Sequence, residues 1–562
     1  MKKTLVLFFI IFLVFSLAGC SQESKVDNTT LYTLNIDKEG NGDITNPSGT
    51  GNFKYEENSV ANITMEPQTG SKFSYWDGED ASEIVEKDYN NWKINMNEDK
   101  SIKAVFNRED IYTLDLREDN DTLSLENYSN NENALIVMFS RDDSDINHLI
   151  EEISVSDADN NTDGNLSNHL NEKEFSTSNY VKKTESEVVT TSKFRKTEKK
   201  QLKNHDELNK ISQSVIQEMA DQKEFKVGDQ EEFIVQYDLD NDLYKTITAT
   251  LKAKSENTLI WVNNSVSIED SYINRYLEEF ENDIRPIVKK YFGREPKEKD
   301  FSILAKYGEA TNILFTPLVD AGGYFHSIHL YSKEKYSNSN ERKMFFMDSE
   351  YADYVDYRIG TLAHEFQHMI YYNERNLNKG FRGYSSWINE GFSCLAEDLV
   401  GYGYEQDLSY VKAVESYINN PTQASLIPWG GEYINYGISY LFARYIYDRF
   451  GKDIITYVNQ SEKGPQESIA SFTNLSFKRI FGDWVITLTG EYNDDIYSYS
   501  SNISIPKMSI STINSNSSIN NIQLKGWVPF IRKVGAGKGN DLNINVQSDS
   551  NKFWIKVKRG EI

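Results

Sequence analysis

Residues 361–373 read TLAHEFQHMIYYN, and our main prediction for the central part of the chain rests on them. His364 and His368 stand four positions apart in a run whose apolar residues recur with the period of an α-helix. Side chains four apart on a helix lie one above the other, about 6 Å along the axis, so both imidazoles can bind one metal ion. Glu365 is one step round the helix, where it can take a proton from a water molecule. The alternative is an ordinary helix with two core or surface histidines.

The stretch WINEGF at 387–392 contains a third candidate ligand, Glu390. A catalytic zinc site uses three protein ligands and keeps one position open. Twenty-one residues separate His368 from Glu390, which opens a second predicted helix. Glu390 is therefore a candidate for the third zinc ligand beside His364 and His368, with Glu365 as the candidate catalytic base.

The sequence around these residues resembles the secreted bacterial neutral metalloproteases of the hyicolysin type, which are gluzincins. The resemblance includes both stretches above, YGISYLFARYIYDRFG at 436–451 and FGDW at 481–484. It extends from about Ser267 to residue 490. It implies an α+β zincin-like catalytic domain, a zinc endopeptidase activity, and the same three ligands and base.

Three further residues are candidates for supporting roles in this site. Glu397 lies near the same helix face as Glu390 and could orient a ligand histidine; a solvated carboxylate is the alternative. Tyr436 is the candidate for stabilising the substrate carbonyl oxygen, from its position relative to related gluzincins. Cys394 stands where the thermolysin branch has an aspartate. We interpret it as a small buried hydrophobe, with zinc ligation as the alternative.

The segment DAGGYF at 320–325 favours an endopeptidase. It lacks the glutamate with which aminopeptidase-type gluzincins bind the free amine of a substrate. A strand is expected from 323 to 331. His326 and His329 would then face opposite sides of that strand and could not share a metal ion.

The gross composition excludes some partners. The chain has 562 residues, which suggests three or four structural units. It carries 86 acidic and 60 basic side chains, a net charge of −26, which phosphate backbones would repel. We therefore expect no nucleic-acid partner. The metalloprotease resemblance implies proteins or peptides as substrates.

The first twenty residues are typical of an export signal. Lys2 and Lys3 precede an apolar run at 5–15, which is shorter than the roughly 20 residues of a spanning helix. The run ends in LAGC at 17–20, which resembles the lipobox of bacterial lipoproteins and implies a lipid on Cys20. An ordinary cleaved signal is the alternative. We expect an extracytoplasmic protein that contacts the membrane only through this lipid.

The stretches FSYWDG at 73–78 and KAVF at 103–106 resemble the divergent internalin-type B repeat of bacterial surface proteins. The whole chain is expected to be multidomain, with these parts: 1–20 lipoprotein signal peptide, 21–30 tether, 31–108 small β-rich B-repeat module, 109–262 β domain with a flexible insert at about 155–215, 263–495 zinc metallopeptidase domain, and 496–562 small C-terminal β module.

Two functions of different classes fit this organisation. The first is a surface-anchored, zinc-dependent endopeptidase. The second is a surface-binding lipoprotein, an adhesin, in which the β modules bind and the metal site is vestigial. The joint presence of both histidines, the base and the third ligand favours the enzyme, because a decayed site would have little reason to keep all four.

Overall fold

The computed structural model describes residues 30–157, 224–297, 307–379, 385–492, 496–535 and 541–560, except for 69–70, 89–90, 109–110, 117–119, 126–127, 129–131 and 501–502. The predicted lipoprotein signal with Cys20, nearly all of the tether and nearly all of the predicted insert lie outside the described residues. Within the described part of the chain, no helix has both the length and the apolar character needed to cross a membrane.

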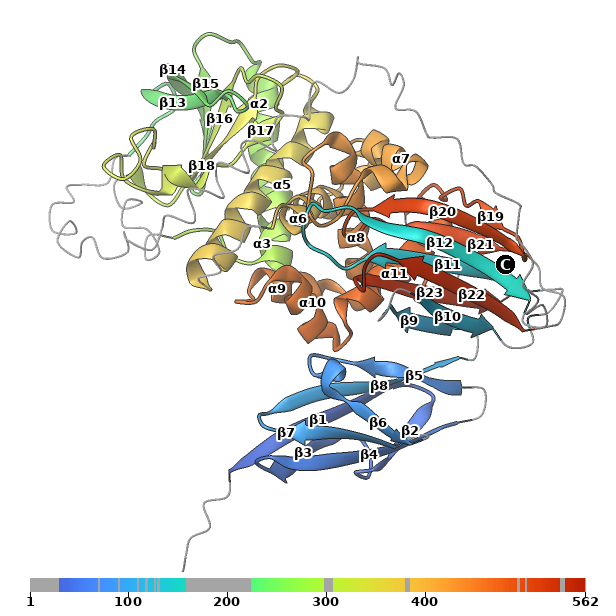
Figure 1. Cartoon of the computed structure of the whole chain (residues 1–562). Helices are drawn as coiled ribbons and strands as arrows, with labels where there is room; N and C mark the ends of the chain where they lie inside the picture. The colour runs from blue at the N-terminus through green and yellow to red at the C-terminus, as the bar shows by residue number, and fades with distance from the viewer. Residues whose placement is uncertain are drawn as a thin grey trace, which may run out of the picture.

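The N-terminal module consists of two four-stranded sheets that enclose one core (Figure 1). The strand orders are β3-β1-β8-β5 and β2-β4-β7-β6. Alternation in β1 places Leu34 and Ile36 in the core, and Trp76 and Trp92 pack against Phe73 there. The strands are β1 (Leu31–Gly40), β2 (Gly42–Asn46), β3 (Gly51–Glu56), β4 (Ser59–Pro67), β5 (Ser71–Asp77), β6 (Val85–Asp88), β7 (Asn91–Met96) and β8 (Lys100–Arg108).

The next strands pair with the strands at the other end of the chain. One sheet has the order β10-β22-β12-β20 and the other β19-β21-β11-β23-β9, with a shared apolar core between them. The strands are β9 (Ile111–Asp115), β10 (Asn120–Leu125), β11 (Asn133–Ser140), β12 (His148–Asp157), β19 (Thr512–Ile513), β20 (Ser517–Leu524), β21 (Phe530–Val534), β22 (Leu542–Ser548) and β23 (Phe553–Gly560).

This sandwich corrects two predicted domain boundaries. A separate β domain at 109–262 and a separate C-terminal module at 496–562 were wrong, because β11 lies between β21 and β23 in one sheet. Residues 224–263 belong instead to the central part. A strand can pair through its backbone with many other strands. Sequence patterns do not show which of them is its neighbour in the sheet.

The central part contains a six-stranded sheet of order β13-β14-β15-β16-β18-β17. In β15, Ile260 and Val262 face a core shared with helices, whereas Leu259 and Trp261 face a second core on the opposite side of the sheet. The strands are β13 (Gln230–Asp238), β14 (Leu243–Lys254), β15 (Thr258–Asn263), β16 (Thr311–Thr316), β17 (Gly323–Tyr324) and β18 (Met344–Asp348).

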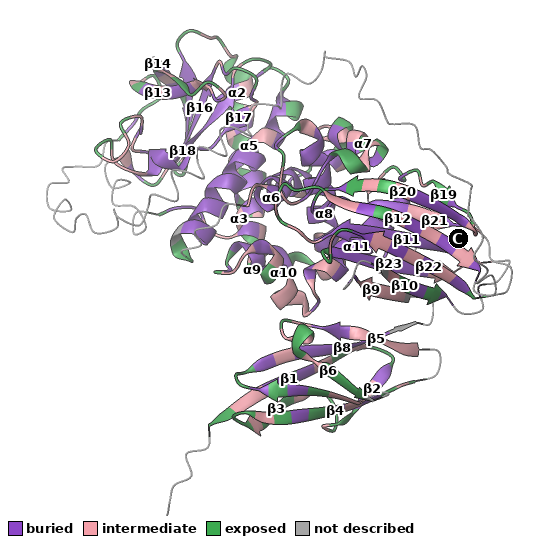
Figure 2. Ribbon diagram, viewed as in Figure 1, coloured by how far each residue is buried: buried purple, intermediate pink, exposed green. Residues whose placement is uncertain are grey.

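The helices of the central part range from mostly buried to mostly half-buried or exposed (Figure 2). They are α2 (Asp270–Glu279), the π-helical η4 (Phe280–Ile284), α3 (Arg285–Phe292), α5 (Val355–Tyr371), the π-helical η6 (Tyr372–Asn378), α6 (Ser386–Leu399), α7 (Val411–Asn419), α8 (Tyr433–Phe450), α9 (Lys452–Asn459), α10 (Pro465–Thr473) and α11 (Phe477–Thr489). The helices expected around His364 and Glu390 are confirmed as α5 and α6.

The strand expected at 323–331 was largely wrong. β17 ends at Tyr324, and a short 3-10 helix, η5 (Ser327–Leu330), follows. His326 and His329 are therefore near each other, with ring centroids 6.0 Å apart. Both are buried, and burial lowers the pKa of His329 to about 3, so its imidazole is neutral and accepts a hydrogen bond from the backbone of Asn340. His329 thus has a structural role.

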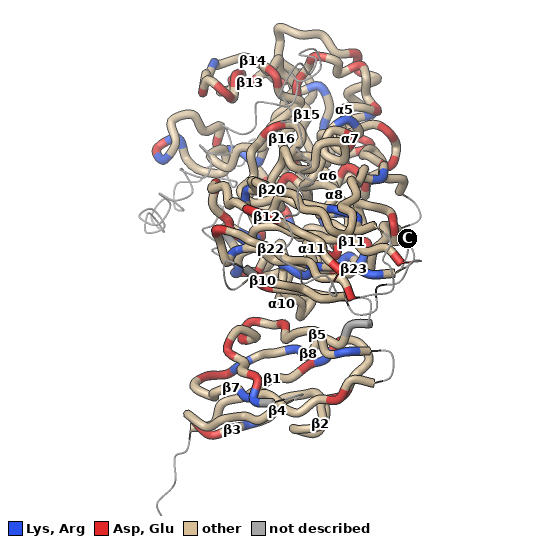
Figure 3. Tube along the Cα trace, turned by 45° about the vertical axis from the view of Figure 1, so that its right-hand side comes forward, with Lys and Arg blue, Asp and Glu red and all other residues tan. Residues whose placement is uncertain are grey.

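The B-repeat module contacts the central part through acidic side chains. Figures 1 and 3 both place β5 and β8 on the side of the module that faces the α10–α11 region. The backbone N–H of Ser476, which precedes α11, donates to the buried carboxylate of Asp77, with both oxygens at 2.7 Å. Arg479 in α11 is buried and forms an ion pair with Glu39. These contacts fix the orientation of the module.

Candidate metal centre

The candidate metal centre lies where α5 packs against α6 (Figure 1). α5 carries His364, Glu365 and His368, and α6 carries Glu390. Gly360 is in the interior of α5, although glycine weakens a helix. A Cβ atom there would lie 2.9 Å from Oε2 of Glu397, so only glycine lets this α6 carboxylate come so close to α5.

Three donor atoms converge at this contact. Oε2 of Glu390 lies 3.3 Å from Nε2 of His364 and 3.5 Å from Nε2 of His368. Donor atoms of all three residues lie within 4.8 Å of one another. The exposed fractions are 6% for His364, 1% for His368 and 0% for Glu390. The structure thus brings together the three ligands predicted from sequence.

The other nitrogen of each imidazole has its own partner. Nδ1 of His364 lies 2.8 Å from Oε1 of Glu397, and Nδ1 of His368 lies 3.0 Å from Oδ1 of Asn389. An Nδ1–H that donates to these oxygens leaves the Nε2 lone pair directed toward Glu390. Glu397, the predicted orienting residue, is buried and is not a solvated carboxylate.

This donor set fits a zinc ion. Two imidazole nitrogens and one carboxylate oxygen are typical zinc ligands, whereas calcium and magnesium prefer oxygen alone. A carboxylate with no exposed surface, as in Glu390, needs positive charge close by, and a divalent cation held with the two histidines would supply it.

Glu365 is buried beside the edge strand of the sheet. A Cβ atom on Gly323 of β17 would lie 3.2 Å from Cγ of Glu365 and 2.7 Å from the carbonyl oxygen of Phe346. Glycine at 323 therefore allows β17 to pass directly against the proposed base. The segment 320–325 that was considered in the sequence belongs to this edge.

A stack of aromatic rings lies on the other side of His364. The hydroxyl of Tyr410 is 3.2 Å from Nδ1 of His364, and its ring stacks on Tyr436. Trp429 packs edge-on against Tyr436. Tyr436, the oxyanion stabiliser predicted from sequence, is therefore separated from His364 by Tyr410. Tyr410 was not predicted from the sequence. Nothing in the sequence marks Tyr410 as a residue of the site. It lies in a loop immediately before α7, with φ in the left-handed region, and its half-buried ring reaches the site from there.

Cys394 lies close to the same histidine. Donor atoms of His364, Cys394 and Glu397 also lie within 4.8 Å of one another. Burial raises the pKa of Cys394 to about 12, although the hydrogen bond with His364 lowers it in part. The burial of Cys394 agrees with its interpretation as a small buried side chain.

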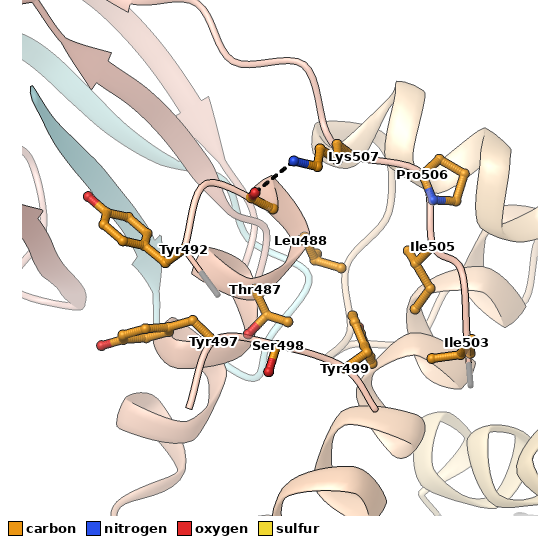
Figure 4. A pocket seen from close by; sticks show the side chains of 11 residues that line it. Thr487, Leu488, Tyr492, Tyr497, Ser498, Tyr499, Ile503, Ile505, Pro506 and Lys507 are labelled. Carbon is orange, nitrogen blue, oxygen red and sulfur yellow. Dashed lines mark hydrogen bonds between the residues drawn. The ribbon is translucent and has the colours of Figure 1, made fainter. Parts of the chain in front are cut away.

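A cavity of about 350 Å³ lies elsewhere, between the end of α11 and the chain that follows it (Figure 4). Its lining includes Tyr492, Tyr497 and Tyr499, and Nζ of Lys507 donates to the carbonyl oxygen of Gly490 across one side. None of its lining residues belongs to the candidate metal centre.

Comparisons with known proteins found two similarities, one to a family model and one to an enzyme. Residues 32–110 match the family model of the divergent InlB B-repeat domain, which confirms the predicted N-terminal module. The chain is also similar to a neutral metalloprotease. Over 220 residues it is 32% identical to the neutral metalloprotease ShpI of Staphylococcus hyicus, covering 35% of this chain and 47% of that protein. The chain thus spans about half the length of that relative.

Proposed function

We propose that the chain is a zinc-dependent endopeptidase of the hyicolysin-type gluzincin class, with a zincin-like catalytic domain, that hydrolyses peptide bonds in proteins. The observation that supports this most strongly is the convergence of Nε2 of His364, Nε2 of His368 and Oε2 of Glu390. The similarity to a neutral metalloprotease favours the enzyme over a surface-binding protein with a vestigial site.

In this proposal His364, His368 and Glu390 hold the zinc ion. When bound, zinc lowers the pKa of a water ligand to near 7 and polarises a carbonyl group. Glu365 accepts a proton from the attacking water and later donates it to the departing amine. Because Glu365 is buried, its carboxylate exchanges this proton away from bulk solvent.

The surrounding residues orient these groups. Glu397 and Asn389 fix the two imidazoles through Nδ1. Tyr436 is the proposed hydrogen-bond donor to the carbonyl oxygen on which negative charge develops. Tyr410, between His364 and Tyr436, would hold both rings in position.

The proposed location is the outer face of the cell envelope, with a lipid on Cys20 as the sole membrane contact. The proposed partners are protein or peptide substrates, and a net charge of −26 disfavours nucleic acid. The B-repeat module would then separate the catalytic domain from the anchor at a fixed orientation.

The test is the zinc content and casein cleavage of the chain from residue 21, compared with the Glu365→Gln variant. We expect about one zinc per chain, cleavage that a chelator abolishes, and a variant that keeps zinc but loses at least 10²-fold in rate. Cleavage by Glu365→Gln at the wild-type rate would rule out the role of this base. A wild-type chain with neither zinc nor cleavage would overturn the enzyme proposal.

A further inference from the structure

The segment from β18 to the first turn of α5 contains a repeat that the metal centre does not use. Residues 350–357 read EYADYVDY, in which an acidic residue precedes a tyrosine three times at intervals of three. The tyrosines are Tyr351, Tyr354 and Tyr357, with exposed fractions of 47%, 63% and 49%. Large aromatic side chains are seldom so exposed, and a contiguous group of them marks an interaction surface.

The repeat lies at the N-terminal end of α5, the helix that carries the two candidate histidine ligands. Tyr357 precedes His364 by seven residues, almost two helical turns, so both side chains lie on one stripe of α5, about 10 Å apart along the axis. Along this stripe the side chains change from exposed Tyr357 through half-buried Thr361 to buried His364 and His368. The stripe therefore leads from solvent to the candidate metal centre.

The three rings form one surface. Tyr351 and Tyr354 meet edge to face with centroids 5.9 Å apart. The guanidinium of buried Arg358 lies 5.9 Å from the ring of Tyr351 and 5.7 Å from that of Tyr357. Tyr351 has a φ of 61°, which is unfavourable for an aromatic residue and is held by the surrounding structure.

The charge of this surface selects the kind of partner. Glu350, Asp353 and Asp356 are exposed among the rings. Asp356 forms an ion pair with Arg275, whereas Glu350 and Asp353 form no ion pair with any described residue. Tyrosine faces attract lysine and arginine side chains, and adjacent carboxylates strengthen that attraction.

We propose that this acid–tyrosine repeat binds the substrate polypeptide through a lysine or arginine side chain. The distance of about 10 Å along α5 corresponds to about three residues of an extended chain, so the cationic residue would lie about three positions from the scissile bond. This inference rests on the proposed endopeptidase function, since it assigns the repeat to the same substrate.

The experiment uses the full chain from residue 21 and two series of fluorescence-quenched peptides that share one cleavable core. One series carries a single lysine two, three or four residues from the cleaved bond, on either side; the other carries norleucine, which has similar length and no charge. For wild type we expect kcat/KM to be about tenfold higher with lysine at one of these positions. In a Tyr354→Ala, Tyr357→Ala double variant this ratio should fall to about one.

Two variants serve as comparisons. Glu350→Gln with Asp353→Asn should lower the ratio partly, because the rings remain. Tyr457→Ala removes a tyrosine of 40% exposure on α9 and should leave the ratio unchanged. Equal zinc content in all variants shows that the fold is intact. A wild-type chain without lysine preference, or a double variant that retains it, would overturn the inference.

Binding of fluorescein-labelled lysine and norleucine peptides, followed by anisotropy, separates this inference from the proposed function. If wild type lacks peptidase activity but binds the lysine peptide more tightly, and the double variant loses this preference, only the enzyme proposal fails. Equal binding of both peptides by wild type would overturn the lysine site whatever the peptidase activity.

Discussion

The hydroxyl of Tyr410 lies 3.2 Å from Nδ1 of His364, and its ring lies 5.5 Å from that of Tyr436 with the planes at 12°. A loop residue thus connects the first predicted metal ligand to the predicted oxyanion stabiliser. Tyr410 has a φ of 56°, a conformation that a bulky residue adopts only when its surroundings hold it there. The contact therefore indicates a role in positioning both rings.

Tyr410→Phe and Tyr410→Ala should separate the two parts of this role. Phenylalanine keeps the stack and loses the hydroxyl, so we expect less than a fivefold change in kcat. Alanine also removes the ring that supports Tyr436, and kcat should fall about tenfold or more because the donor is no longer held. Steady-state kinetics with one peptide measures both. Equal effects of the two substitutions would contradict a role for the ring.

Tyr436→Phe tests the proposed donor itself. Loss of one donor to a developing oxyanion costs about 10²–10³ in kcat, whereas substrate binding changes little. We expect kcat to fall by that amount with KM and zinc content near wild type. A kcat within threefold of wild type would leave Tyr436 with a packing role only.

Glu397→Ala should weaken zinc binding. Residues that hydrogen-bond the outer nitrogen of a ligand histidine typically contribute 10- to 100-fold to metal affinity. Competition with a fluorescent zinc chelator measures the change. Glu415→Ala, which removes an exposed carboxylate from α7, is the matched control and should bind zinc as wild type does.

The buried cluster around Glu295 should make stability depend on pH. Burial alone would raise the pKa of Glu295, but the charges of Lys343 and Arg285 outweigh burial and lower it to about 2. A lowered carboxylate pKa stabilises the fold above the unfolded-state pKa of 4.5, and this contribution is lost as pH falls from about 4.5 to about 2. The shift corresponds to about 3 kcal/mol at neutral pH.

Glu295→Gln should therefore lower the free energy of unfolding at pH 7 by about 3–5 kcal/mol, because two buried cations lose their partner. The difference from wild type should shrink progressively between pH 4.5 and pH 2. Urea unfolding followed by circular dichroism measures it, with exposed Glu278→Gln as the control. A difference that stays constant over this range would contradict the assigned pKa.

Asp77→Ala should loosen the docking of the B-repeat module. Asp77 is buried and accepts the backbone N–H of Ser476, so its removal leaves this donor without its partner at a cost of about 1–3 kcal/mol. We expect a larger radius of gyration in small-angle X-ray scattering and faster proteolysis between the module and β9. Glu86→Gln, on an exposed position of β6, should change neither.

The candidate site could be predicted well from the sequence because its parts are local. The spacing of His364 and His368 is a property of one helix, and Glu390 opens the next one. The B repeat was predicted because its motifs are local as well. Tyr410 could not be predicted, since no local rule says which loop residue will reach a helix 46 positions away in sequence.

The domain boundaries could not be predicted for the same reason. The sequence predicted β structure at 109–262 and at 496–562, but sequence patterns contain no information on pairing between the two groups. Only the structure shows that Val137 pairs with Ile531 on one side and Lys556 on the other. Because the paired strands are so far apart in sequence, we predicted two separate modules.

The pairing of β11 with β21 and β23 delays the folding of the sandwich until both groups of strands have been made. During synthesis, β9–β12 emerge well before the strands with which they pair, and contacts so distant in sequence form slowly. Until then the apolar side chains of β11 remain without the neighbours that cover them. A chain that lost β20–β23 through proteolysis would expose the same surface and become prone to aggregation, so an intact C-terminal strand group is a requirement for the solubility of the N-terminal half of the sandwich.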